Sequence, residues 1–534
     1  MRSKAIPAAV LVIIGSALAG GFAGAQSANV RDRAEARLNV YAAALAAIEN
    51  EYVEPVERAD VVHGSIDGLL RTLDPHSAFF TRRAFDQMQE RQTGRYFGIG
   101  ISIVSVNGDV TVTSLFEGSP AYRAGIRRGD LIAKVGEENA KGWETEEVVR
   151  RVKGPKGTTV DISIRRPGVE KLIDLTVERD EIHITTVRTA FMMAPGTGYV
   201  RLQDFSETTD DELGDALQKL TANGMQRLLL DLRDNPGGPL DQAIAVANRF
   251  LKKNELIVYT RGRIPNSAAD YRATVEGGYV NVPMVLLVSR GSASASEIVA
   301  GAMQDHDRAI VVGETTFGKA LVQSVYPLSS GAGLAVTTGR YYTPQGRLIQ
   351  RPWDGAFDEY LSYSVRDQNG PREHNPAELK YTIGGRKVYS GGGIEPDHFV
   401  PGPVEGFNPT RFSRLLMQRG AFIGFAERFT KKGDTRPASA SAATYVVASG
   451  WDVTDEMVAA FRSYLIAQKV RVDEAALKAD EPFIRAMIHF EVNNDLFSFE
   501  EARRNLSKVD PQILAALGYF EESRNLLVTT RASR

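Results

Sequence analysis

The spacing of apolar residues between Arg31 and Met88 predicts helices. Four of these residues fall on one helical face: Leu38, Tyr41, Leu45 and Ile48. The segment 73–77 (Leu-Asp-Pro-His-Ser) interrupts this pattern, because proline restricts the residue before it to extended geometry. We therefore expect helices joined by a turn, with too few apolar residues for a core of their own.

A different pattern begins near Gly94, where short runs rich in β-branched residues are separated by Gly, Asn and Pro. The runs cover residues 99–106, 110–112, 160–164 and 172–177. This pattern predicts a small β-rich domain.

From Gly198 onward, predicted strands alternate with predicted helices. The strands cover residues 198–202, 227–232, 284–288 and 309–312, and the helices 213–220, 243–251 and 296–303. Such alternation is typical of an α/β layer structure with a largely buried sheet.

Beyond Pro401 the sequence is mainly helical, with a Pro/Ala/Ser linker at 436–443. Apolar spacing over 458–468 and 483–488 predicts two of the helices. This part carries no recognisable motif, so we interpret it as a structural or partner-binding module.

The N-terminus has the order of a signal peptide. Arg2 and Lys4 precede an uncharged, mostly apolar run over 5–25 that ends in Ala-Gly-Ala. We favour cleavage after Ala25, which would leave Gln26 first, although the run is also long enough for an uncleaved membrane anchor. Either way, the body of the protein is expected outside the cytoplasm, periplasmic or otherwise extracytoplasmic.

The composition limits which partners and which catalytic groups the protein can use. The 534 residues are enough for several domains, and 64 Lys and Arg against 66 Asp and Glu leave a net charge of −2. No basic excess therefore indicates nucleic acid or an anionic membrane surface as a partner. The absence of cysteine excludes disulfides, thiolate metal sites and a cysteine nucleophile. Hydroxyl, amine, carboxylate and imidazole chemistry remains, and we expect neither a metal nor a cofactor.

The β-rich part carries a series of glycine motifs. Gly-Ile-Gly-Ile at 98–101 is followed by Gly-Ser-Pro-Ala at 118–121, Ala-Gly-Ile at 124–126 and Gly-Asp-Leu-Ile at 129–132. Each glycine alone could serve only a turn, but the order and spacing resemble a PDZ domain. That resemblance implies that the loop before the first motif binds a terminal carboxylate and that its strand pairs with a peptide. The implied peptide-binding residues are Gly98, Ile99, Gly100 and Ile101.

Ser294 lies in the centre of Gly-Ser-Ala-Ser-Ala-Ser-Glu at 291–297, where a predicted strand passes into a predicted helix. A helix N-terminus offers N–H groups and a positive dipole end, so the N–H of Ala295 could face an oxyanion. A serine-rich helix start is more often only a cap. Lys319 ends Gly-Glu-Thr-Thr-Phe-Gly-Lys after another buried strand, although a lone lysine is normally solvated.

Together these segments resemble the catalytic region of carboxy-terminal processing (tail-specific) proteases. The resemblance includes Gln304-Asp305, Val322-Gln323 and the serine-to-lysine spacing. It implies Ser294 as the nucleophile, Lys319 as its general base and Gln323 as the partner that orients Lys319. Ala320 stands where this family usually has glycine.

Asp-Leu-Arg-Asp-Asn-Pro-Gly-Gly at 231–238 resembles the family element that supplies the second oxyanion donor, here Gly237 or Gly238. Glycine fits because its backbone can approach a substrate closely, although a plain strand-to-helix turn would explain it too. We interpret Glu297 and Asp305 as structural.

The resemblance runs from Tyr52 to Asp397 and implies a crotonase-like α/β core with an inserted PDZ domain. It also implies cleavage of proteins that present apolar C-terminal tails. The fold class is thus α/β within an α+β multidomain chain. The expected division is a leader or anchor at 1–25, helices at 26–92, the PDZ domain at 93–182, the protease core at 183–405 and a helical module at 406–534. A homo-oligomer is left open.

Two other functions fit parts of the sequence. A Ser/His/Asp protease with a PDZ domain is disfavoured, because none of the seven histidines lies in a matching motif and no Gly-x-Ser-x-Gly is present. A PDZ scaffold that binds tails without cutting them would have no reason to keep both Ser294 and Lys319 in their motifs.

Overall fold

The computed structural model describes residues 35–106, 108–116, 118–166, 168–265, 267–353, 357–365, 374–431 and 450–532. The predicted leader at 1–25 and the linker at 436–443 lie outside these residues. The chain forms two compact units. One contains the chain up to Thr81 with Val325–Val336, and the other contains Arg82–Ser324 and everything from Thr337 on.

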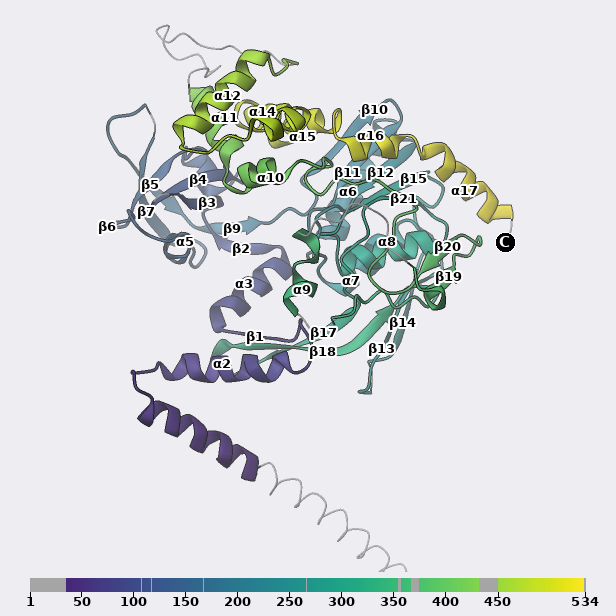
Figure 1. The fold of residues 1–534 in the computed structure, drawn as a ribbon, viewed down its shortest axis with the longest axis horizontal. Helices are drawn as coiled ribbons and strands as arrows, with labels where there is room; N and C mark the ends of the chain where they lie inside the picture. The colour runs from purple at the N-terminus through teal and green to yellow at the C-terminus, as the bar shows by residue number, and fades with distance from the viewer. Residues whose placement is uncertain are drawn as a thin grey trace, which may run out of the picture. The chain divides into compact units, whose positions relative to one another are not determined.

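The first unit contains a helix over residues 35–51, α2 (Arg58–Arg71) and the short strand β1 (Ala78–Phe80), seen at the purple end of the ribbon (Figure 1). The predicted turn is present, and the Asp74 carboxylate fixes it by accepting from the N–H groups of His76 and Ser77, 2.8 Å each. After the turn the chain forms a strand before it returns to helix, because β1 pairs with residues 333–335. On the apolar face of the 35–51 helix, Leu38, Tyr41 and Ile48 are exposed, Leu38 by 64%, and Leu45 is half-buried.

The β-rich part contains an antiparallel sheet in the order β3-β4-β5-β7-β8, with β6 paired to β5. Its elements are β3 (Ile101–Val106), β4 (Asp109–Leu115), α4 (Pro120–Arg123), β5 (Leu131–Val135), β6 (Glu138–Asn139), α5 (Thr145–Val152), β7 (Thr159–Arg165) and β8 (Ile173–Glu178). Before and after it, β2 (Arg95–Gly98) pairs with β9 (Asp180–His183). Alternating side chains such as Val110, Ile132 and Ile162 form the core of this sheet.

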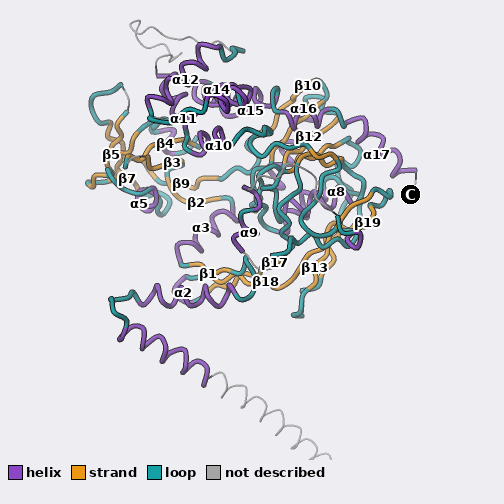
Figure 2. The backbone as a smooth tube through the Cα atoms, viewed as in Figure 1, coloured by secondary structure: helices purple, strands orange, loops and turns teal. Residues whose placement is uncertain are grey.

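The α/β part contains a six-stranded sheet in the order β10-β11-β12-β15-β16-β21 (Figure 2, orange). Its strands are β10 (Thr189–Ala194), β11 (Thr197–Arg201), β12 (Arg227–Asp231), β15 (Met284–Val288), β16 (Ile310–Gly313) and β21 (His398–Phe399). Only β10 is antiparallel to its neighbour. The five parallel strands therefore have their carboxyl ends at one edge, where α/β proteins bind ligands.

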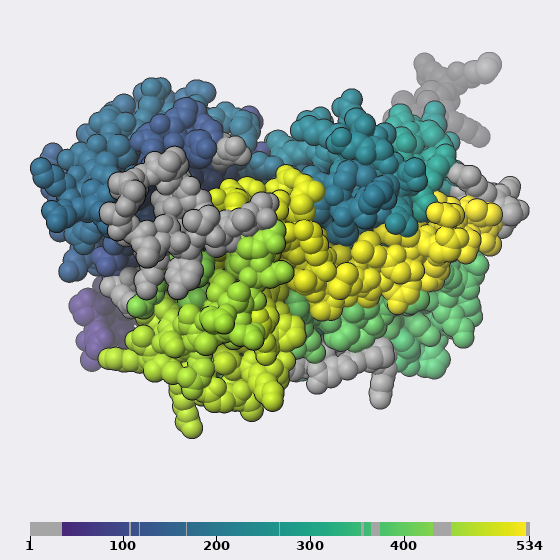
Figure 3. Space-filling model, turned by 90° about the horizontal axis from the view of Figure 1, so that it is seen from above, coloured from purple at the N-terminus to yellow at the C-terminus, as the bar shows by residue number. Residues whose placement is uncertain are grey.

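Both faces of this sheet are covered. Leu228 and Leu230 point to one face, which packs against α6 (Thr209–Ala222), α7 (Leu240–Asn248) and α8 (Ala295–Asp305). Leu229 points to the other face, where it joins side chains of α16 (Pro511–Leu517) and α17 (Phe520–Ala532). Alternation along a strand explains this two-sided burial. The last residues of the chain, in yellow, thus lie along the teal and green residues of the core (Figure 3).

The other elements are a helix before β2, further strands beside the core with one short helix among them, and the helices that follow. They are α3 (Arg82–Thr93), β13 (Leu256–Arg261), β14 (Ala269–Arg272), β17 (Leu321–Pro327), β18 (Gly333–Tyr342), α9 (Phe357–Leu361), β19 (Leu379–Tyr381), β20 (Lys387–Tyr389), α10 (Arg411–Gln418), α11 (Ala421–Lys431), α12 (Asp455–Ala467), α13 (Glu474–Ala479), α14 (Glu481–Leu496) and α15 (Phe499–Ser507). The helices from α10 to α15 share an aromatic core that includes Phe422, Phe461 and Phe483. Across the described ranges, no helix combines the length and apolar character needed to cross a membrane.

Candidate active site

Three loops meet at the carboxyl edge of the six-stranded sheet. They follow β12, β15 and β16, which are consecutive neighbours in the sheet. Parallel strands bring their following loops to the same edge, so segments far apart in sequence become adjacent. These loops contain the three sequence motifs singled out above: residues 231–238, 291–297 and 313–319.

The serine-rich loop is anchored by two of its serines. The hydroxyl of Ser292 donates to the carbonyl of Leu232, 2.7 Å, and that of Ser296 donates to the carbonyl of Asn235, 3.0 Å. Both side chains are fully buried. Ser294 lies between them, half-buried, with a φ of 53°. A positive φ is unfavourable for a non-glycine residue and recurs at active sites, so this serine differs from its neighbours.

Glu297 connects the segment of Ser294 to the segment of Lys319. Its Oε2 accepts from the backbone N–H groups of Ser294 and Lys319, 2.9 Å each. Its Oε1 accepts from the hydroxyl of Thr316, 2.5 Å, and the N–H of Gly318, 2.7 Å. The side chain is completely buried; burial raises the pKa of this carboxyl, and the four hydrogen bonds act in the opposite direction. One carboxylate thus fixes both segments.

Tyr341 of β18 makes a second connection. Its hydroxyl lies 2.6 Å from the carbonyl oxygen of Lys319 and 3.2 Å from that of Ser294, and donates its proton to them. The side chain is 2% exposed, and burial raises the pKa of the hydroxyl well above its usual value. Tyr341 therefore acts as a neutral donor between the two segments.

Lys319 and Gln323 lie together, as the resemblance implies. Lys319 Nζ donates to Gln323 Oε1, 3.2 Å, and both side chains are half-buried. Ala320 is completely buried and does not need the left-handed backbone that favours glycine. Alanine therefore fits where the family usually has glycine.

The loop after β12 lies directly against Ser294. A Cβ on Gly237, whose φ is 91°, would lie 2.8 Å from the Cβ of Ser294 and 2.7 Å from the nitrogen of Ala295. The N–H of Gly237 donates to Asn235 Oδ1, 2.8 Å. Because the N–H of Gly237 is already used, Gly238 is the better candidate for one oxyanion donor. Ala295 is the candidate for the other, since it is the first residue of α8 and its N–H has no acceptor within the helix.

Family models match two parts of the chain. Peptidase family S41 matches residues 196–355, and the PDZ domain matches residues 87–165. A carboxy-terminal-processing protease of Bartonella bacilliformis is 38% identical over 307 residues, which are 57% of this chain and 70% of the relative. The carboxy-terminal processing protease CtpA of Bacillus subtilis is 33% identical over 329 residues, 61% of this chain and 69% of the relative.

The chain belongs to the carboxy-terminal-processing protease family. It is therefore a serine peptidase with a PDZ domain, as the sequence predicted. A solved PDZ domain of the Vibrio cholerae carboxy-terminal protease, in complex with a peptide, is 31% identical to it. That match covers 17% of this chain and 98% of the other, with a TM-score of 0.16.

The PDZ motif of the protease occupies the bend between β2 and β3. Gly98 ends β2, Ile101 begins β3, and Gly100 has a φ of 79°. The side chain of Ile99 is buried in the domain core, 1% exposed, so this residue could contact a ligand only through its backbone. β3 is a terminal strand of its sheet, which leaves one of its edges for another partner.

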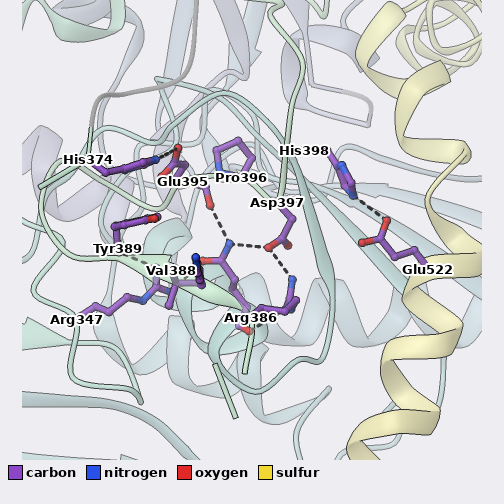
Figure 4. A pocket seen from close by; sticks show the side chains of 12 residues that line it. Arg347, His374, Arg386, Val388, Tyr389, Glu395, Pro396, Asp397, His398 and Glu522 are labelled. Carbon is purple, nitrogen blue, oxygen red and sulfur yellow. Dashed lines mark hydrogen bonds and ion pairs between the residues drawn. The ribbon is translucent and has the colours of Figure 1, made fainter. Parts of the chain in front are cut away.

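A separate polar pocket of the protease has a volume of about 320 Å³ (Figure 4). His374 pairs with Glu395, 3.4 Å, and His398 with Glu522, 2.8 Å. Neither Ser294, Lys319 nor Gln323 lines it. Over the described parts of the chain, no group of three or more His, Cys, Asp or Glu is arranged to hold a metal ion.

Sequence reasoning missed what Glu297 and Tyr341 do. The sequence predicts a structural role for Glu297, and its hydrogen bonds fit that role, but they lie inside the candidate site. The spacing Ser-x-x-Glu at a helix start is a capping signal that could have indicated its bond to the N–H of Ser294. For Tyr341 the sequence offered no signal, since the contact depends on where β18 lies.

Proposed function

We propose that this protease is a serine endopeptidase that cleaves exported proteins at or near their C-terminal tails, with Ser294 as nucleophile and Lys319 as general base. The observation that carries the proposal is the carboxylate of Glu297, which binds the backbone N–H groups of both residues. Two residues fixed on the same carboxylate oxygen have their side chains within one small region of the molecule.

In the proposed reaction, the hydroxyl oxygen of Ser294 attacks the scissile carbonyl carbon while the neutral amine of Lys319 takes the hydroxyl proton. The N–H groups of Ala295 and Gly238 stabilise the oxyanion. Lys319 then gives the proton to the leaving amine, so that the peptide bond breaks and an acyl-enzyme remains. Water, deprotonated by Lys319, hydrolyses the ester and restores Ser294. Gln323 holds the amine of Lys319 in place by accepting a hydrogen bond from it.

A digestion assay tests this function. Purified protein should cleave casein or a peptide with an apolar C-terminal tail, and Ser294→Ala should abolish cleavage while it still binds the tail. Ser463→Ala, at an exposed serine of α12, is the matched control and should keep full activity. A wild-type protein that binds tails without cutting them would support the scaffold alternative. Cleavage by Ser294→Ala would contradict the nucleophile assignment and reopen a Ser/His/Asp mechanism.

The PDZ domain is proposed to select substrates by their free C-terminal carboxylate. A tail would add a strand to the free edge of β3, and the backbone N–H groups around Gly98–Ile101 would bind the carboxylate. Amidation of the terminus removes the charge and should lower kcat/KM by about tenfold or more, since hydrogen bonds to charged groups contribute about 1.5–3 kcal/mol. Competition between free and amidated peptides of one sequence measures this effect. Equal cleavage of both would show that the domain does not recognise the carboxylate.

Export is proposed from residues 1–25 alone, which precede the described part of the chain. With a cleaved leader the enzyme would be free outside the cytoplasm, and with an uncleaved one it would be anchored there.

A further inference from the structure

The loop that carries the oxyanion glycines is held by the C-terminal helices. Arg233 of this loop is 3% exposed, and three groups surround its guanidinium. Nη2 lies 2.7 Å from Asp231 Oδ2 and 2.8 Å from Asp510 Oδ2, and Nη1 donates to Gln512 Oε1, 2.9 Å. Asp510 and Gln512 lie at the start of α16, beyond both family-model matches.

These partners are themselves fixed. Asp510 accepts from the N–H groups of Gln512 and Ile513 and so caps α16. The amide of Gln512 donates to the carbonyl of Val400, 2.7 Å, just after β21. Gln512 is completely buried and Asp510 is 2% exposed. The start of α16 is therefore a rigid support for Arg233.

A second chain of ion pairs reaches the same loop. Arg503 of α15 pairs with Glu405, 3.1 Å, and Glu405 pairs with Arg201, 3.2 Å, which lies 3.6 Å from Asp234. Burial alone would raise the pKa of Asp231, but the charges of Arg233 and Arg201 lower it to about 2. Asp231 is thus ionised at neutral pH. Burial raises the pKa of Asp510, and the charge of Arg233 acts in the opposite direction. A buried ion pair is stable only when its geometry is good and its remaining hydrogen bonds are made.

Residues 233–238 connect Arg233 directly to the proposed oxyanion site. Asn235, two residues on, accepts from the N–H of Ala293 and the hydroxyl of Ser296, 3.0 Å each, and its side chain receives the N–H of Gly237. A shift at Arg233 would therefore move Gly238 relative to Ser294. Displacement of an oxyanion donor weakens transition-state binding far more than substrate binding.

We propose that Asp510 and Gln512 are positioning residues for catalysis, through which the C-terminal helices set the geometry of the oxyanion loop. This inference rests on the proposed function of Ser294. In this arrangement Gln512 accepts a hydrogen bond from Arg233, and Asp510 neutralises the charge of that guanidinium. The C-terminal helices then help to set the geometry of the active site.

The test compares Gln512→Met, which removes the acceptor for Arg233 at similar size, with Gln512→Glu, which keeps one. A matched control is Ser523→Ala. Ser523 is also completely buried and joins α17 to the core, but its hydroxyl bonds the backbone of Met284, at the opposite end of β15. For Gln512→Met we expect kcat to fall by about 10- to 100-fold with little change in KM, because misplacement of about 1 Å has effects of this size.

Affinity for a peptide boronate, whose tetrahedral adduct with Ser294 places an oxygen in the oxyanion site, should fall in parallel. Gln512→Glu keeps the acceptor for Arg233 but loses the donor to the carbonyl of Val400, so it should recover part of kcat. Ser523→Ala should keep kcat at temperatures where it is folded. Unchanged kcat and boronate affinity in folded Gln512→Met would overturn the inference, as would an equal loss in folded Ser523→Ala. A wild-type enzyme that neither cleaves nor binds the boronate would instead overturn the proposed function and this inference with it.

Discussion

Lys319→Met is expected to lower peptide cleavage by about 10³-fold or more, since it removes the general base. Lysine can accept the Ser294 proton only when neutral, whereas an ordinary lysine has a pKa near 10.4. Lys319→Arg should be equally inactive, because guanidinium stays charged. Cleavage of a fluorogenic tail peptide measures both variants, and Lys219→Met, at an exposed lysine of α6, is the matched control.

The same requirement predicts how pH affects activity. Activity should rise with pH over the range in which the protein is folded, because a general base must be neutral to accept a proton. Lys319→Met should melt at the same or a higher temperature, because it replaces a half-buried amine with an apolar side chain of similar length. Substantial activity in Lys319→Met, or wild-type activity that falls steadily from about pH 6 to 9 in folded protein, would contradict the dyad.

Glu297→Gln is expected to reduce kcat by about 100-fold and the free energy of unfolding by about 2–4 kcal/mol. Each oxygen of this carboxylate accepts two hydrogen bonds. A glutamine amide keeps only one of the two oxygens as an acceptor. Its NH₂ group must therefore face either the N–H groups of Ser294 and Lys319, or the hydroxyl of Thr316 and the N–H of Gly318. One of the two loops of the candidate site loses its anchor in either orientation.

Glu212→Gln separates this effect from general destabilisation. Glu212 is half-buried in α6 and accepts from the backbone N–H groups of Thr186 and Val187 and from the hydroxyls of Thr186 and Thr208. It therefore has the same kinds of partner as Glu297, away from the loops of the candidate site. This variant should lose stability in chemical denaturation but keep kcat per folded molecule. If folded Glu297→Gln retained kcat to the same degree, Glu297 would have no part in positioning the dyad.

The elements that the sequence predicted best have strong local signals. The strand at Met284–Val288 was predicted at its observed bounds, because five apolar residues in a row end at a serine and an arginine. The motifs around Ser294 and Lys319 are short and contiguous, so the sequence indicates them directly, and the catalytic roles of the two residues stay a prediction. β1 was missed, since three residues have no detectable period and form a strand only by pairing with β18.

Local sequence patterns do not indicate which distant residues contact the loops of the candidate site. Arg233 and Gln512 are separated by 279 residues, and nothing near either one indicates the other. Their contact depends on α16 covering one face of the sheet, which is a consequence of how the whole core packs. The sequence predicts a structural or partner-binding module here, and no local pattern indicates that Ile513, Ala516 and Phe520 pack into the core beneath the sheet.

The position of α16 and α17 also sets an order in which the core is completed during translation. Ile513 and Phe520 are made after the strands that they cover, so one apolar face of the sheet stays uncovered until these helices have been made. The loop with Arg233 acquires Asp510 at the same stage. A chain truncated before α16 would therefore expose apolar surface of its sheet and would be prone to aggregation.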